Sequence, residues 1–192
     1  MNLPNKLTML RIILTPVFLA VLYWGFPGAD YVALAIFIIA SLTDLLDGKI
    51  ARKYNLVTDF GKFADPLADK ILVVAAMLWF VECGRMPAWM VMIVITREFA
   101  VSGLRMIASD NGRVIAAGWS GKVKTASTMV CIVVMLLMGP TLAYHQSQAA
   151  VTAVPASYFT WIDVLCGWVI TLTTLYSGVE YFVKNKDVIQ SA

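Results

Sequence analysis

Six apolar segments follow one another along this chain and leave little sequence between them. They occupy residues 7–24, 31–50, 66–82, 87–107, 123–144 and 158–183. Each is close to the roughly 20 residues that an α-helix needs to cross about 30 Å of hydrocarbon. Their residues are continuously apolar rather than alternately apolar and polar, which argues against a transmembrane β-barrel. We therefore expect an all-α, polytopic membrane protein with six transmembrane helices.

The composition agrees with this expectation. Hydrophobic residues make up 60% of the 192 residues, and charged residues only 14%. A soluble domain has about 45–50% apolar and about 25% charged residues, so this chain has too little polar material to cover a water-facing surface. The six segments leave no room for a separate soluble domain. Residues 1–192 are expected to form a single transmembrane domain.

The lysines and arginines between the segments predict the orientation, because cytoplasmic loops are enriched in them. The first, third and fifth connections contain only Arg85. The N-terminus, the even connections and the C-terminus carry Lys6, Arg52, Lys53, Lys62, Arg113, Lys122, Lys184 and Lys186. We expect both termini in the cytoplasm and the protein in the cell membrane. The basic residues form a collar that suits anionic lipid headgroups, and they show no nucleic-acid footprint.

Acidic residues interrupt this apolar pattern at regular spacings. Asp44 and Asp47 are three residues apart, and Asp65 and Asp69 are four apart. On α-helices each pair falls on one face. The connection between the second and third segments is short, so their helices should be antiparallel neighbours. The four carboxylates are expected to converge in the cytoplasmic half of the protein.

Four convergent carboxylates in a membrane need a positive partner. One charge at the centre of a span costs roughly 2.5–3.5 kcal/mol, and four acids would also repel one another. Ligation by oxygen alone favours hard cations such as Mg²⁺ or Mn²⁺, which keep open positions for phosphates. We expect one or two divalent ions here. Residues outside the expected site are the loop residues Asp59 and His145 and the free or packed cysteines Cys83, Cys131 and Cys166.

Three further residues beside the acids favour a phosphate ligand. Gly48 and Gly61 have no side chain, which lets a phosphate approach the backbone closely. Arg52 lies near Asp47 in the sequence and can form bidentate contacts with phosphate. Their placement together with the acids carries this prediction.

The string DLLDGKIARKYNLVTDFGKFADPLAD, residues 44–69, resembles the signature of the CDP-alcohol phosphotransferases. The resemblance implies transfer of a phosphoalcohol unit from a CDP-linked donor to an alcohol, with release of CMP. It implies two divalent ions, Mg²⁺ or Mn²⁺, held by Asp44, Asp47, Asp65 and Asp69, with Asp69 also acting as the general base. It implies a CDP pocket walled by Gly48, Ala51, Arg52 and Gly61.

Three other segments resemble the bacterial phosphatidylglycerophosphate synthase branch of that family. They are LPNKLTMLR at residues 3–11, TREFAVSGLRMIAS at residues 96–109 and GKVKT at residues 121–125. This resemblance implies CDP-diacylglycerol and sn-glycerol 3-phosphate as substrates, and it places Asn5 and Thr8 near the nucleotide. It also implies a homodimer, because relatives tend to be homodimers.

Basic residues of the fourth and fifth segments favour an anionic acceptor. Arg97 and Arg105 lie in the fourth segment, and Lys122 and Lys124 lie at the start of the fifth. Intramembrane basic groups are functional candidates, and we expect these four to bind the acceptor phosphate. Snorkelling to the interface is the alternative for Lys124. Glu98 is expected to pair with another helix.

Two alternative functions remain open from the sequence. The same chemistry could use another acceptor, such as inositol phosphate, serine or phosphatidylglycerol. A cation-coupled transporter could also carry an acidic cluster, but its acids should lie near the bilayer midplane with access from both sides. The cytoplasmic placement of the acids favours the transferase.

Overall fold

The computed structural model describes residues 3–54, 59–110, 115, 118–148 and 157–186. Side chains are described for residues 7–43, 67, 68, 70–108, 115, 118–139 and 161–186. Across these residues the secondary structure is helical and contains no strand, as the sequence predicts. The helices are α1 (Leu3–Trp24), α2 (Ala29–Tyr54), α3 (Asp59–Glu82), α4 (Ala88–Asp110), α5 (Trp119–Gln148) and α6 (Ser157–Lys184).

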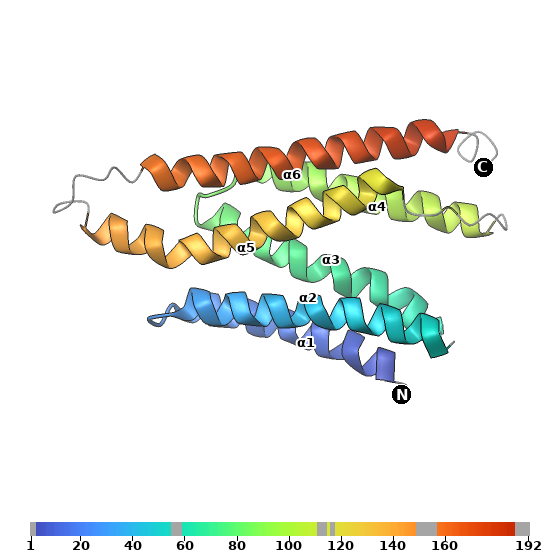
Figure 1. Cartoon of the computed structure of the whole chain (residues 1–192), viewed down its shortest axis with the longest axis horizontal. Coiled ribbons are helices and arrows are strands. Elements are labelled where there is room, and N and C mark those ends of the chain that lie inside the picture. The colour runs from blue at the N-terminus through green and yellow to red at the C-terminus, as the bar shows by residue number, and fades with distance from the viewer. Residues whose placement is uncertain (1–2, 55–58, 111–114, 116–117, 149–156, 187–192) are drawn as a thin grey trace.

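Successive helices run in opposite directions (Figure 1). As a consequence, the start of α1, the end of α6 and the ends that flank the α2–α3 and α4–α5 connections lie at the same end of the bundle. We call this the inner end and the opposite one the outer end. Helix α1 packs against α2 and α3, α5 packs against α6 and α2, and α4 packs against α6. Helices α2 and α3 are antiparallel, as expected, but their described residues contact each other only sparingly.

Several helices extend beyond the predicted apolar segments, and two of these extensions change a prediction. Helix α3 begins at Asp59, seven residues before the predicted segment, so Asp59 is helical and the prediction of a loop residue is wrong. Helix α5 continues to Gln148, which makes His145 helical as well. Backbone hydrogen bonding does not stop where the apolar residues stop, and an acidic residue at a helix start is favourable for the helix dipole.

Three helices contain stretches that are long and apolar enough to cross a membrane, as counted over the described residues. These stretches are Leu7–Trp24, Trp119–Gly139 and Trp161–Lys184. Ala29–Thr43 in α2 is a shorter apolar stretch. These three stretches have the length and composition of membrane-spanning helices.

The distribution of side chains agrees with a lipid environment. Large side chains such as Phe18, Phe37 and Met135 fill the core between the helices. The outside is apolar too, and the tryptophans near helix ends are strongly exposed: Trp24 by 81%, Trp119 by 78% and Trp161 by 70%. Tryptophan is enriched where a membrane meets water. The described surface is therefore apolar along the helices and aromatic near their ends.

Candidate functional site

The four predicted aspartates lie on two helices that approach the inner end. Asp44 and Asp47 are in the second half of α2, and Asp65 and Asp69 are in the first half of α3. Both pairs are on helical backbone, which is the condition that their spacings require. Their side chains are outside the described residues, so the convergence of the four carboxylates stays a prediction.

Most of the predicted CDP pocket also lies on these helices. The members with helical backbone but undescribed side chains are Asn5 on α1, Gly48, Ala51 and Arg52 on α2, and Gly61 on α3. Thr8 is the described member, and its side chain is completely buried near the start of α1. Helix α1 packs against both acid-bearing helices. The helix that carries Asn5 and Thr8 therefore neighbours both acid-bearing helices, and the pocket itself stays a prediction.

A partly buried carboxylate, Glu98 on α4, connects three helices close to this region. Its Oε1 accepts a hydrogen bond from Nζ of Lys124 on α5 at 2.6 Å and one from Nη1 of Arg97 at 2.9 Å. Arg97 also donates from Nη2 to Oγ of Ser177 on α6 at 2.6 Å. Glu98 thus pairs with another helix, as the sequence predicted. Lys124 is buried rather than snorkelling, with only 5% of its surface exposed.

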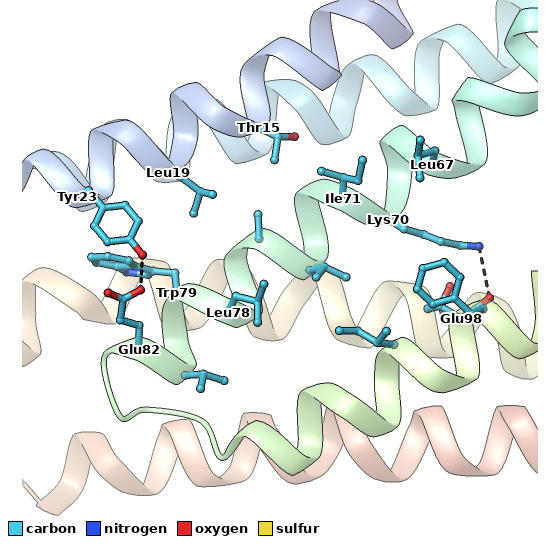
Figure 2. A pocket seen from close by; sticks show the side chains of 15 residues that line it. Thr15, Leu19, Tyr23, Leu67, Lys70, Ile71, Leu78, Trp79, Glu82 and Glu98 are labelled. Atoms are coloured by element: carbon cyan, nitrogen blue, oxygen red, sulfur yellow. Dashed lines mark hydrogen bonds between the residues drawn. The ribbon is translucent and has the colours of Figure 1, made fainter.

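A fourth helix joins this group through Lys70 on α3, the residue after Asp69. Lys70 Nζ donates a hydrogen bond to Oγ of Ser102 and lies 3.4 Å from the backbone oxygen of Glu98. Figure 2 shows the Lys70 side chain reaching from α3 toward Glu98. We call Lys70, Arg97, Glu98, Ser102, Lys124 and Ser177 the Glu98 network.

A glycine on α6 makes room for the Arg97 side chain. A Cβ added to Gly178 on α6 would lie 3.1 Å from Cγ of Arg97, which is closer than ordinary packing allows. A Cβ on Gly121 of α5 would lie 4.0 Å from Nη2 of the same arginine, which is an ordinary contact distance. Small residues let helices approach closely in membranes. Here Gly178 leaves the space that the Arg97 side chain occupies beside α6.

The other two predicted acceptor ligands are more open. Arg105 on α4 is exposed, donates from Nε to the Tyr181 hydroxyl at 3.2 Å, and stacks over the Tyr181 ring at 5.5 Å. Lys122 at the start of α5 is exposed. Both cations lie nearer the inner end than Arg97 and Lys124. Arg105 follows Arg97 on α4, which runs toward that end, and Lys122 precedes Lys124 on α5, which starts there.

An apolar groove of about 650 Å³ runs between α1, α3 and α4. Its walls include Leu19, Leu67 and Leu78. Figure 2 shows polar pairs near both of its limits: the Tyr23 hydroxyl donates to Glu82 at the outer limit, and Lys70 meets Glu98 at the inner one. The inner limit is formed by the same turn of α3 that carries Asp69.

The four aspartates of α2 and α3 are the candidate metal ligands. Within the described residues no three histidine, cysteine or acidic side chains lie close enough together to hold a metal ion. Cys83, Cys131 and Cys166 are free, as expected. Asp44, Asp47, Asp65 and Asp69 form a set of oxygen donors, and this chemistry fits hard divalent cations.

The outer end carries a separate polar cluster. Helix α3 ends in a glycine turn: Gly84 has φ of 69°, its N–H donates to Val81, and the N–H of Arg85 donates to Phe80. This arrangement satisfies carbonyls at the helix end. It also directs Arg85 to Asp163 on α6, with N–O distances of 2.7 and 2.8 Å.

Two ionisable groups near Arg85 have shifted pKa values. Burial raises the pKa of the Asp30 carboxyl above its ordinary value, and the Arg85 guanidinium opposes part of that rise. Partial burial also raises the pKa of the Cys83 thiol, while Arg85 lowers it and the carboxylates of Asp30 and Glu82 raise it further. Both groups lie in or beside connections at the outer end.

The family model for CDP-alcohol phosphatidyltransferase matches residues 1–178 of the chain. The chain belongs to this family. It is 41% identical over 203 aligned residues to the CDP-diacylglycerol–glycerol-3-phosphate 3-phosphatidyltransferase of Bacillus subtilis, with 100% of this chain and 98% of the relative covered. It is 38% identical over 188 residues to a probable phosphatidylglycerophosphate synthase of Mycobacterium tuberculosis, with 95% and 81% covered.

A third relative extends this similarity to another bacterial group. The CDP-diacylglycerol–glycerol-3-phosphate 3-phosphatidyltransferase of Salmonella typhimurium is 39% identical over 166 residues, which cover 83% of this chain and 90% of the relative. The chain therefore matches these CDP-alcohol phosphatidyltransferases over most of their length. The family identified from residues 44–69 is confirmed.

Sequence reasoning missed several residues around the site of this CDP-alcohol phosphatidyltransferase. Lys70 was the one with a readable signal, because a lysine beside Asp69 inside an apolar run needs an explanation. Ser102, Ser177 and Tyr181 had no such signal. Each becomes informative only through a partner from a distant part of the chain.

Proposed function

We propose that the chain transfers the phosphatidyl group from CDP-diacylglycerol to sn-glycerol 3-phosphate, giving phosphatidylglycerol phosphate and CMP. The observation that carries the proposal is the match to relatives with this activity in their names over 83–100% of the chain. The aspartate signature on α2 and α3 supports the same chemistry. The exposed Arg105 and Lys122 support an anionic acceptor.

The proposed topology has six spans, with both termini and the inner end in the cytoplasm. The alternating helix directions support it, because the start of α1 and the end of α6 lie at the same end (Figure 1). The concentration of lysine and arginine in the inner connections supports the orientation. The active site then opens to the cytoplasm, where a water-soluble acceptor enters, and the membrane is the bacterial cytoplasmic membrane.

Asp44, Asp47, Asp65 and Asp69 would hold two divalent ions, Mg²⁺ or Mn²⁺. When bound, such ions neutralise phosphate charge and stabilise the leaving phosphate. The aspartates themselves fix the position of this charge between α2 and α3. Gly48 and Gly61 keep the backbone accessible to the pyrophosphate, and Arg52 can donate to it in a bidentate manner. Ala51, Asn5 and Thr8 complete the proposed CDP pocket.

Asp69 is the proposed general base. It takes the proton from the primary hydroxyl of glycerol 3-phosphate, and the resulting oxygen attacks the phosphorus linked to diacylglycerol. The bond from that phosphorus to the CMP oxygen breaks, and CMP leaves. For this role Asp69 must be ionised near neutral pH, and neighbouring cations favour the ionised form.

The acceptor phosphate is proposed to bind at the inner ends of α4 and α5. Arg105 and Lys122 are the exposed candidates there. Arg97 and Lys124, the other two predicted ligands, lie deeper and pair with Glu98. A charge-assisted hydrogen bond from the planar guanidinium of Arg105 suits a phosphate oxygen.

The donor lipid is proposed to keep its acyl chains in the bilayer while its pyrophosphate reaches the aspartates from the side. The apolar groove between α1, α3 and α4 supports such a route, since its inner limit lies on the α3 turn that carries Asp69.

We also propose a homodimer, which the extensive exposed apolar surface supports. Cross-linking in native membranes measures that state.

The test is an assay of purified protein in detergent with CDP-diacylglycerol, glycerol 3-phosphate and Mg²⁺ or Mn²⁺. We expect release of CMP that depends on all three additions. Parallel reactions replace glycerol 3-phosphate by inositol phosphate, serine or phosphatidylglycerol. Faster CMP release with one of these would reassign the acceptor, and no CMP under any condition would overturn the proposed function.

A further inference from the structure

The Glu98 network joins four helices at the level of the catalytic signature. Glu98 belongs to α4, and its Oε1 accepts hydrogen bonds from Lys124 of α5 and from Arg97. Arg97 extends the connection to Ser177 of α6. Lys70 extends it to α3 through Ser102 and the Glu98 carbonyl. A rotation of any one of these helices would break at least one of these contacts.

The contact from Lys70 matters most for the position of the acids. The apolar groove lies between α3 and α4, so apolar side chains do not fill that space completely. At the inner limit of the groove, Lys70 reaches across to α4 (Figure 2). Lys70 directly follows Asp69 in the helix. A contact that fixes Lys70 therefore fixes the helical turn that presents Asp69.

Stability alone is a weak reason for such a network. Removing ions from water is costly, and replacing a buried ion pair by apolar residues is often neutral or stabilising. The network brings two cations, Arg97 and Lys124, to one carboxylate and a third, Lys70, to the backbone oxygen of the same residue. Lys124 is 5% exposed. Polar groups of this kind inside membrane proteins mark functional regions.

Acceptor binding is also a poor explanation for the two deeper cations. Arg97 Nη1 and Lys124 Nζ both donate to the same oxygen of Glu98. Arg97 Nη2 donates to Ser177 at 2.6 Å. A phosphate would have to displace these contacts. The small cavity beside Lys70, Glu98 and Lys124 measures about 40 Å³. This is little more than the roughly 30 Å³ that one water molecule occupies in the liquid.

We propose that Glu98 and Lys70 are positioning residues, which hold the inner turn of α3 against α4 so that Asp69 meets the acceptor hydroxyl. This inference rests on the proposed function. Glu98 acts by holding Arg97 and Lys124, and Lys70 acts by bridging to Ser102. Neither residue needs to touch a substrate.

The primary variant is Glu98→Gln, which keeps the shape of the side chain and removes its charge. We expect kcat for CMP release to fall by about 10- to 100-fold, as for small misplacements of reacting groups. The KM for glycerol 3-phosphate should stay near the wild-type value. The matched control is Glu180→Gln on α6, which removes the exposed ion pair with Lys184 and should leave both constants unchanged.

Two milder changes test the bridge to α3 directly. Ser102→Ala removes the hydroxyl that accepts from Lys70 and leaves every charge in place. We expect its kcat to fall by about 3- to 10-fold, the value of one hydrogen bond. Lys70→Arg retains a charged donor and should lose less kcat than Lys70→Met. Elution from a sizing column and the melting temperature in detergent report folding for every variant.

Each outcome decides between the explanations. A raised KM for glycerol 3-phosphate with unchanged kcat would make the network an acceptor site and overturn the proposal. Unchanged kcat in a folded Glu98→Gln protein would overturn it as well. If Glu98→Gln fails to fold, Ser102→Ala decides: reduced kcat supports positioning and unchanged kcat rejects it. No CMP from the wild-type protein with any acceptor would overturn the proposed function itself, and this inference with it.

Discussion

The guanidinium of Arg85 donates hydrogen bonds to both carboxylate oxygens of Asp163, a residue 78 positions later in the chain. The N–O distances are 2.8 Å from Nε and 2.7 Å from Nη2, and the side chains are 10% and 3% exposed. Arg85 also donates to the backbone oxygen of Met135 at 2.8 Å. The single basic residue of the predicted outer connections is thus neutralised by α6. This pair ties the α3–α4 turn to α5 and α6.

Loss of either partner of the Arg85–Asp163 pair should destabilise the protein strongly. Arg85→Met or Asp163→Leu leaves a buried charge without its partner and should cost about 3–5 kcal/mol. The double variant should be less damaged than the sum of the two single variants. Thermal unfolding of the four proteins in detergent measures this cycle. Exact additivity would show that the two side chains do not act as a pair.

Asp69→Asn should nearly abolish CMP release while the protein still folds. The amide cannot take the proton of the acceptor hydroxyl, and loss of a general base lowers rates by about 10²–10⁴-fold. Asp59→Asn at the first residue of α3 is the control and should remain active. Turnover is measured with saturating substrates. Substantial activity of a folded Asp69→Asn protein would assign the base elsewhere.

Arg105→Gln should weaken acceptor binding selectively. Loss of one charge-assisted hydrogen bond to phosphate should raise the KM for glycerol 3-phosphate by about tenfold or more. The KM for CDP-diacylglycerol should change little. Lys184→Gln provides a basic residue of the inner end that pairs within α6, and its kinetics should match those of the wild type. Equal increases in both KM values for Arg105→Gln would indicate a general structural defect.

Asp30 predicts a pH-dependent contribution to stability with a defined sign. Because burial raises its pKa in the folded protein, the folded state keeps the proton to higher pH than the unfolded state, whose value is 3.8. This group's contribution is therefore most favourable below pH 3.8 and declines as pH rises through the raised folded pKa. The melting temperature of wild type relative to Asp30→Asn should fall as the pH is raised from 3.8. A difference that does not change with pH would contradict this assignment.

Cys83 offers a test of membrane orientation without engineered cysteines. It is exposed in the α3–α4 connection, whereas Cys131 and Cys166 are buried. A membrane-impermeant maleimide added to intact cells should label the protein at Cys83, and Cys83→Ser should abolish the signal. Because the thiol pKa is raised, labelling should accelerate as the pH increases. Labelling only after the membrane is opened would invert the proposed topology.

The helical fold and the family were accessible from sequence because both depend on local patterns. Apolar segments of span length predict helices. The spacings that identify the signature all lie within residues 44–69, on two consecutive helices. Helix ends were less accessible: α3 extends to Asp59 and α5 to Gln148. Helical backbone hydrogen bonds continue through polar residues at an interface, where hydropathy gives no signal.

The site was accessible only in part for a related reason. Spacing along one helix identifies a shared face, so the aspartate pairs could be read from the chain. Ser177 and Tyr181 could not, because their partners Arg97 and Arg105 lie 80 and 76 residues away. Such contacts depend on how whole helices pack. For the same reason, the sequence could not distinguish a snorkelling Lys124 from one buried against Glu98.

The ion pair between Glu98 and Lys124 bears on how the protein enters the membrane during synthesis. Helix α4 carries Arg97, Glu98 and Arg105, and each charge opposes insertion by about 2.5–3.5 kcal/mol when it lies near the middle of a span. The cation that matches Glu98 lies 26 residues later, on α5. During synthesis, Glu98 therefore lacks this partner until α5 has been made.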